Sequence, residues 1–101
     1  MSTIIELSVF PVDKGESVSN YVAMAVKIIR ESGLPYDIGP MGTSIEGELD
    51  EVMNVAIKCI KELANSSNRV YWTIKGDLRK ERSHGLLQKV ESVRKKLDAL
   101  D

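Results

Sequence analysis

The sequence predicts an α+β fold, on the basis of three observations. Stretches in which apolar and other side chains alternate are followed by stretches in which apolar residues recur three or four positions apart, and these are the periods of strands and helices respectively. Glycine and proline separate the stretches, as in "SGLPYDIGPMG", where they favour turns. The length of 101 residues suits a single domain. We therefore expect residues 1–101 to form one domain around one core.

The first half of the chain predicts a strand, a helix and a pair of short strands. Residues 3–10, "TIIELSVF", alternate as a strand and end at Pro11, which cannot donate to a central ladder. One face of this strand carries Ile5, Leu7 and Val9, and the other carries Ile4, Glu6, Ser8 and Phe10. Apolar residues then recur at helical spacing over residues 18–29. Residues 36–46 predict two short strands around the turn "GPMG".

The second half predicts a helix, a strand and a further helix. Acidic residues at 48–51 favour a helix start, and the expected buried stripe of that helix is Leu49, Val52, Met53, Ala56, Ile60 and Leu63. The segment "RVYWTIKGD" alternates as a strand, with Val70, Trp72 and Ile74 on one face and Tyr71, Thr73 and Lys75 on the other. The charged link "LRKER" leads to a last helix from about Ser83. The apolar seam of that helix is Leu86, Val90, Val93, Leu97 and Leu100, spaced alternately four and three positions apart.

This order of elements is β-α-β-β-α-β followed by one more helix, which is the ferredoxin-like pattern. Such a fold is an antiparallel sheet with two helices on one face, so the other face needs a polar surface or a cover. Both predicted long strands carry apolar residues on both faces. The seam of the last helix covers the open face within one chain, or it meets a second chain. We favour a homo-oligomer.

The composition excludes several classes of function. The net charge of −1 gives no field that would recruit nucleic acid, and no apolar stretch approaches the roughly 20 residues of a membrane span. The start of the chain has no basic segment typical of a signal peptide. Cys59 is the only cysteine, so the expected location is the cytoplasm. His84 is the only histidine and has no partner at ligand spacing, so no metal site is expected.

Carboxylates near the strands are the most informative polar residues. Glu6 and Ser8 share a face of the first strand, and Ser44 with Glu46 repeats the same pairing. A covered carboxylate needs a partner, because burying an unpaired charge is costly. A lysine or backbone groups would satisfy it, and so would a ligand that carries donors or positive charge.

Three segments together resemble the small thiamine-binding protein family of the YkoF-like superfamily. They are "SVFPVDKGESVSNYVA", "SGLPYDIGPMGTSIEGELDEVM" and "RVYWTIKGDLR…KVESVRKKL", of which "GPMGTSIEGE" is the most specific. The resemblance implies ferredoxin-like domains that pair sheet against sheet, commonly into a tetramer built as a dimer of dimers. It also implies a small-molecule ligand, thiamine or its hydroxymethylpyrimidine half. We expect no cofactor.

The chemistry of thiamine defines which residues are candidates. Its aminopyrimidine needs a carboxylate and hydroxyls, and its cationic thiazolium needs negative charge beside an apolar wall. The expected ligand-binding residues are Thr43, Glu46, Ser44, Met41, Gly42, Glu6, Ser8, Ser19 and Tyr21. Thr43 and Glu46 are an odd number of positions apart, so a bend is needed for both to face one pocket. Without a bend, Ser44 replaces Thr43 as the partner of Glu46.

Two other functions remain possible on the sequence alone. An oligomeric regulatory or structural module without a ligand would use the same apolar surfaces. An enzyme acting on a small heterocycle would use Glu6 or Glu46 as a base, but the sequence offers no nucleophile–base pair, so no catalytic residue is expected. The segment "KGDLRKER" suggests a phosphate site through Lys75, Arg79, Lys80 and Arg82, although its alternating charges favour a solvated turn.

Overall fold

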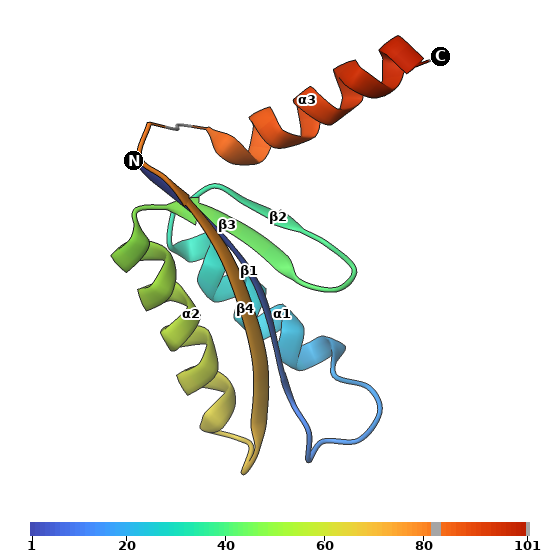
Figure 1. Cartoon of the computed structure of the whole chain (residues 1–101). Coiled ribbons are helices and arrows are strands. Elements are labelled where there is room, and N and C mark those ends of the chain that lie inside the picture. Colours follow the sequence, from blue (N-terminus) through green and yellow to red (C-terminus); the bar gives the residue numbers. More distant parts are fainter. Residues whose placement is uncertain (82–83, 101) are drawn as a thin grey trace.

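The computed structural model describes residues 1–81 and 84–100 of the chain (Figure 1). The elements in order are β1 (Ser2–Pro11), α1 (Ser19–Glu31), β2 (Tyr36–Ile38), β3 (Thr43–Gly47), α2 (Leu49–Ala64), β4 (Val70–Arg79) and α3 (Gly85–Leu100). The predicted strand that begins in "RVYW" thus extends to Arg79, two residues into the expected charged link. The expected helix start at Ser83 lies outside the described residues.

The strands form one antiparallel sheet in the order β2-β3-β1-β4. β1 pairs with β3 from Thr3 to Leu7 and with β4 along its whole length, from Ser2 opposite Arg79 to Pro11 opposite Val70. Helices α1 and α2 pack against the sheet and against each other. The ferredoxin-like fold with an additional C-terminal helix is confirmed.

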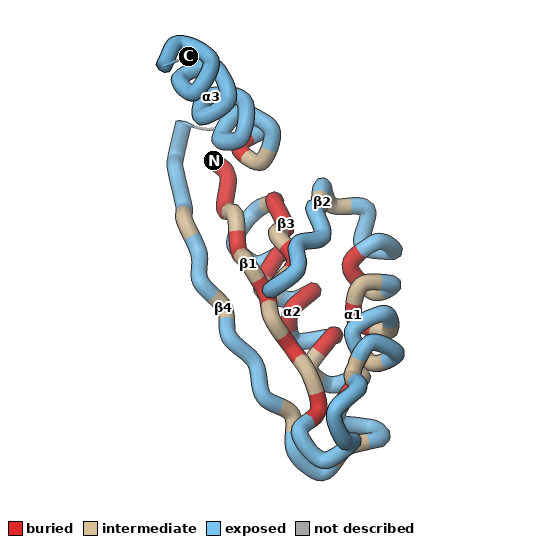
Figure 2. Tube along the Cα trace, turned by 90° about the vertical axis from the view of Figure 1, so that its right-hand side faces the viewer, coloured by how far each residue is buried: buried red, intermediate tan, exposed pale blue. Residues whose placement is uncertain are grey.

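The core lies between the sheet and these two helices, and Figure 2 shows the buried residues along β1 and on the inner sides of α1 and α2. Ile5, Leu7 and Val9 point into it, as the alternation predicts. On α2 the prediction is only partly correct, because Leu49 is 44% exposed whereas Val55 and Cys59 are buried. The cause is α1, which packs along the flank of α2 that carries these last two residues.

The open face of the sheet carries both apolar and charged residues. Residues directly opposite one another in an antiparallel pair share a face, so Lys75 lies beside Glu6 and Tyr71 lies beside Phe10. The rings of Phe10 and Tyr71 are 5.7 Å apart between centroids. The other face of β4 carries Trp72, which is still half exposed. Apolar side chains therefore lie on both faces of β1 and β4, mixed with charges on the open face.

Helix α3 does not cover the open face within the chain. It begins against β3 and β1 and then projects away from the sheet (Figure 1). Its seam is exposed beyond Leu86, which is half-buried, with Val93 at 65% and Leu97 at 56%. Across the described residues, no helix has both the length and the apolar character that crossing a membrane requires.

Candidate functional site

Most of the expected ligand-binding residues lie in two separate cavities, Glu46 forms a buried anchor, and Ser19 and Tyr21 lie outside both cavities. β3 pairs with β1 residue by residue from Thr43 to Gly47, without a bulge. Thr43 therefore lies on the helix side of the sheet, and Ser44 and Glu46 lie on the open side. The bend that would bring Thr43 and Glu46 together is absent, so Ser44, and not Thr43, shares a face of the sheet with Glu46.

The first cavity is an apolar cleft between α1 and the β2–β3 hairpin, with a volume of about 230 Å³. Met41, Gly42 and Thr43 line it on the hairpin side, and valines of α1 line the opposite wall. The only polar side chains among its lining residues belong to Ser8 and Thr43. The cleft thus offers a wall for a flat ring but supplies no carboxylate for an amino group.

The second cavity, the open-face cavity, is about 230 Å³ in volume and lies under the start of α3. It is lined by Ile4, Glu6, Ser44, Lys75, Gly76, Asp77 and Lys89. The strand registers explain this set, because Glu6 lies between Ser44 and Lys75, and Ile4 lies opposite Asp77. The cavity combines two carboxylates, a hydroxyl and an apolar floor on one side of the sheet.

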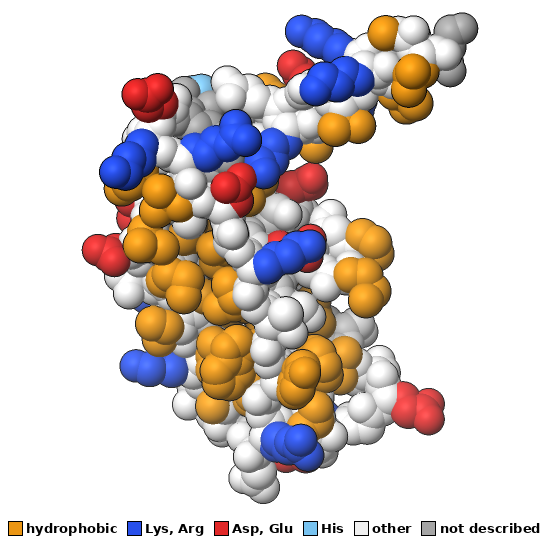
Figure 3. Space-filling model, viewed as in Figure 1, with side chains coloured by type: hydrophobic (Ala, Val, Ile, Leu, Met, Phe, Trp, Pro, Cys, Tyr) orange, Lys and Arg blue, Asp and Glu red, His pale blue; other side chains and the backbone are white. Residues whose placement is uncertain are grey.

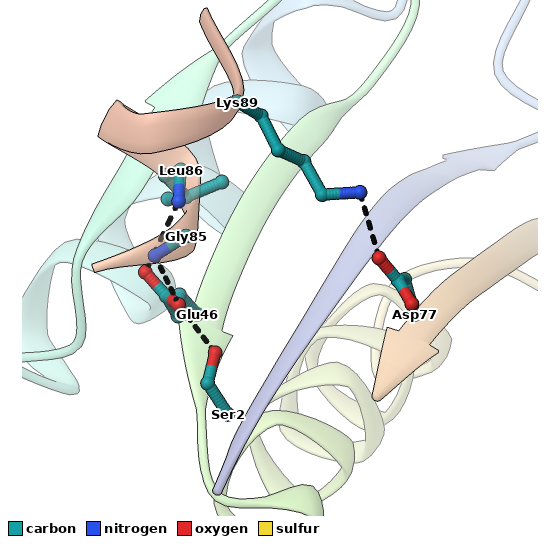
Figure 4. Close-up of polar contacts among 6 residues, drawn as sticks. All are labelled: Ser2, Glu46, Asp77, Gly85, Leu86 and Lys89. Atoms are coloured by element: carbon teal, nitrogen blue, oxygen red, sulfur yellow. Dashed lines mark hydrogen bonds and ion pairs between the residues drawn. The ribbon is translucent and has the colours of Figure 1, made fainter. Parts of the chain in front are cut away.

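The charged residues around the open-face cavity form two ion pairs, each between a lysine and a carboxylate. Lys75 Nζ is 3.6 Å from Glu6 Oε1, and Lys89 Nζ donates to Asp77 Oδ2 at 2.7 Å (Figure 4). Lys75 and Lys89 remain mostly exposed, and Glu6 is about half as exposed as Lys75. Exposed ion pairs of this kind contribute little to stability, so a ligand that brings its own positive charge can replace a lysine at low cost.

Gly42 holds the hairpin against Glu6. A Cβ at this position would lie 3.0 Å from Glu6 Cγ and 3.1 Å from the Leu7 carbonyl oxygen, closer than side chains normally approach. Gly42 does not have a positive φ, so close packing, and not backbone conformation, is the reason that glycine is needed at this position. Gly47 is similar, since its Cβ would meet Leu34 Cδ2 at 3.2 Å. Gly42 therefore links the two cavities by placing the rim of the cleft directly beside the carboxylate of the open face.

Glu46 is buried and holds the start of α3 (Figure 4). Its carboxylate accepts a hydrogen bond from the Gly85 N–H at 2.6 Å and from the Leu86 N–H at 3.2 Å, and Ser2 donates its hydroxyl to the same group. The first N–H groups of a helix lack partners within the helix and carry partial positive charge. Glu46 thus satisfies them from β3, and its carboxylate is engaged within the chain.

Three further expected residues take no part in the open-face cavity. Ser8 lines the cleft and lies opposite Thr73 in the β1–β4 pairing. Ser19 is exposed at the first turn of α1, and Tyr21 packs against the core. Neither Ser19 nor Tyr21 lines either cavity.

The sequence did not single out Asp77 or Lys89 as cavity residues. Asp77 follows the same alternation as Tyr71 and Lys75, so the register of β4 would have placed it on the open face. Lys89 is brought there only by the anchoring of α3, which the sequence does not reveal. Lys75 and Arg79 lie in β4, so the solvated turn favoured for "KGDLRKER" is wrong for residues 75–79. Arg82 lies outside the described residues, and the alternative phosphate site stays a prediction.

Neither thiol nor metal chemistry is supported among the described residues. Burial raises the pKa of the Cys59 thiol to about 11. The thiol donates a hydrogen bond to the Ala25 carbonyl oxygen, 3.5 Å from Sγ. A buried thiol with a high pKa is a poor nucleophile. Residues 1–81 and 84–100 contain no group of three or more metal-ligating side chains.

Comparison with known proteins identifies a group of similar sequences and structures. The family model described as "Thiamine-binding protein" matches residues 5–94. A UPF0045 protein of Methanothermobacter thermautotrophicus is 44% identical over 96 residues, which cover 91% of this chain and 96% of the relative. The crystal structure of the hypothetical protein MJ1052 of Methanocaldococcus jannaschii superposes with a TM-score of 0.85 at 30% identity, over 91% of this chain and 95% of the other. A Thermotoga maritima protein, provisionally named for thiamine biosynthesis or salvage, superposes with a TM-score of 0.81 at 20% identity, over 92% of this chain and 99% of the other. At this identity the similarity is one of fold.

Proposed function

Because the chain belongs to the thiamine-binding protein family, we propose that it is a non-catalytic binding protein for thiamine or its hydroxymethylpyrimidine half. The observation that supports this most strongly is the open-face cavity, where a carboxylate, a hydroxyl and an apolar floor meet. The family description names binding and indicates no catalytic activity. A reducing compartment such as the cytoplasm suits the free thiol of Cys59.

Both rings of the ligand have partners in the open-face cavity. The Glu6 carboxylate accepts from the exocyclic amine of the pyrimidine, and the Ser44 hydroxyl serves a ring nitrogen. Ile4 provides the surface on which the flat ring lies, and Asp77 offers negative charge to the thiazolium. Glu6 takes the role expected of Glu46, because the Glu46 carboxylate is engaged by Ser2 and the start of α3.

A second copy of the chain completes this site. The cavity is open on its outer side, and a charged hydrogen bond contributes most where water is excluded. The exposed seam of α3, including Val93 and Leu97, provides apolar surface for such a cover. We therefore propose a homo-oligomer, a tetramer built as a dimer of dimers, in which ligands lie close to the contact between sheets.

Isothermal titration calorimetry with thiamine tests the proposal. The wild type is expected to bind, and Glu6→Gln is expected to lower the affinity by roughly ten- to a hundredfold, because a hydrogen bond to a charged group contributes about 1.5–3 kcal/mol. Glu31→Gln is the matched control, since Glu31 also pairs with a lysine, at 4.0 Å from Lys27 Nζ, but lies on α1.

The outcomes separate the proposed function from its alternative. Absence of heat with thiamine and with hydroxymethylpyrimidine, from an oligomeric wild type, would favour a regulatory or structural module without this ligand. Equal affinity of Glu6→Gln and Glu31→Gln would retain the ligand but remove Glu6 from the site.

A further inference from the structure

The outer edge of β4 is a long, uncovered strand edge. All of its residues from Val70 to Arg79 pair with β1 on one side. β4 is the last strand in the sheet order, so among residues 1–81 and 84–100 no strand pairs with its other side. An uncovered edge of this length presents a row of backbone donors and acceptors to a further strand.

Apolar side chains accompany this edge on the helix side of the sheet. Trp72 is 50% exposed, Leu78 is 42% exposed, and Ile57 of α2 is 44% exposed. Ile57 belongs to the flank of α2 that faces away from α1, since Val55 and Cys59 occupy the α1 side. Figure 1 views the molecule with β4 in front, and Figure 3 shows hydrophobic side chains gathered over α2 and β4 in that view. A strand added at this edge would cover them.

Among the antiparallel registers centred on residues 74–77 of β4, one sets opposite charges directly against each other. Residues directly opposite each other in an antiparallel pair point to the same face of the sheet. Two copies therefore keep their helices on one side of a joined sheet only when a residue faces the same residue of the second copy, with the two-fold axis between them. An axis at Lys75 sets two lysines against each other, and an axis at Asp77 sets two aspartates against each other. An axis at Gly76 places Lys75 opposite the second copy's Asp77 and Ile74 opposite the second copy's Leu78.

We infer that two copies of this chain pair through their β4 edges, in antiparallel register about Gly76, to form one continuous sheet. The charges then alternate across the junction, from Glu6 to Lys75 of one copy and from Asp77 to Lys89 of the other, and both existing ion pairs are kept. Lysine on an edge strand usually discourages pairing, but here each lysine meets a carboxylate.

This inference rests on the proposed homo-oligomer and identifies one of its surfaces. A dimer of dimers needs two different two-fold contacts. Pairing at the β4 edge supplies one contact at the border of the open-face cavity and leaves the rest of the open face and α3 free for the other.

Single cysteines along β4 test both the contact and its register. In a pair centred on Gly76, the two residues at position 76 face each other within the Cα separation that a disulfide allows. The position accepts a side chain, because a Cβ there makes an ordinary contact of 3.4 Å with Ile5 Cγ2. Under mild oxidation in dilute solution, Gly76→Cys is expected to become a covalent dimer. Ile74→Cys, Lys75→Cys and the wild type, whose Cys59 is buried, are expected to stay uncrosslinked.

Hydrogen exchange of the unmodified protein gives a second readout that needs no folding of a variant. Alternate amides of β4, those that point away from β1, are expected to be protected in the oligomer. A wild type that is oligomeric by light scattering but shows free exchange at these amides and no Gly76→Cys dimer would overturn the edge contact, while the homo-oligomer itself would stand. Preferential crosslinking of Lys75→Cys would overturn the register. A monomeric wild type would overturn both proposals.

Discussion

The Glu46 carboxylate anchors the start of α3, whereas the sequence suggests that it is available to a ligand. Its odd separation from Thr43 places the two side chains on opposite faces of a regular strand, and β3 pairs regularly, without a bend that would bring them together. Gly42 precedes the strand, so the chain changes direction before Thr43. The sequence could show that Glu46 needs a partner, but the partner comes from α3, 39 residues away.

Glu46→Gln is expected to loosen α3. The amide retains one acceptor but loses the negative charge beside the helix N-terminus, and hydrogen bonds to charged groups contribute about 1.5–3 kcal/mol. Native-state hydrogen exchange should show faster opening of the first turns of α3, while β3 exchanges as before. Glu91→Gln, an exposed carboxylate change on α3 itself, is the control. Unchanged exchange in α3 together with lost thiamine affinity would instead assign Glu46 to the ligand.

Cys59 gives the folded protein a pH dependence above neutrality. The folded-state pKa is raised from 9.0 to about 11 by burial, so between these values the unfolded chain loses the thiol proton first. The contribution of the protonated Cys59 thiol to the free energy of unfolding is therefore complete below pH 9. As the pH rises from 9 toward 11, the free energy of unfolding falls by up to about 1.4 kcal/mol per pH unit. Urea unfolding of the wild type and of Cys59→Ala across this range measures it. Parallel pH profiles for the two proteins would contradict the burial of the thiol.

At the scale of elements, alternation and helical spacing were sufficient to predict the order of strands and helices. They were insufficient to predict which residues of α2 are buried. Val55 and Cys59 are covered by α1, and the spacing of apolar residues in α2 does not show on which flank another helix packs. The seam of α3 was also predicted, but whether it covers its own sheet depends on the direction in which Glu46 holds the helix.

The exposed seam of α3 is expected to support assembly. Val93 is 65% exposed within one chain, so Val93→Asp should fold normally, and it should weaken a contact that would bury the new charge. Light scattering is expected to show a smaller particle for Val93→Asp than for Ser92→Asp, which adds the same charge to the same turn away from the seam. Identical masses for the two variants would exclude this seam from the assembly.

At the scale of the whole molecule, the fold follows from local patterns, but the site follows from strand register. The open-face cavity takes residues from β1, β3, β4 and α3. The pairing of Glu6 with both Ser44 and Lys75 brings the strand residues together, and the anchoring of α3 by Glu46 adds Lys89. A resemblance in "GPMGTSIEGE" locates the hairpin near the site. It does not reveal that Met41 and Thr43 face the cleft while Ser44 faces the opposite side of the sheet.

The central claim is that thiamine binds on the open face beside Glu6, and amide chemical shifts test it most directly. Thiamine titrated into the ¹⁵N-labelled protein is predicted to shift the amides of Glu6, Ser44 and Lys75, and to leave those of Val22 and Val26 at the wall of the cleft unchanged. Shifts confined to the cleft, or no shifts at saturating thiamine, would contradict it.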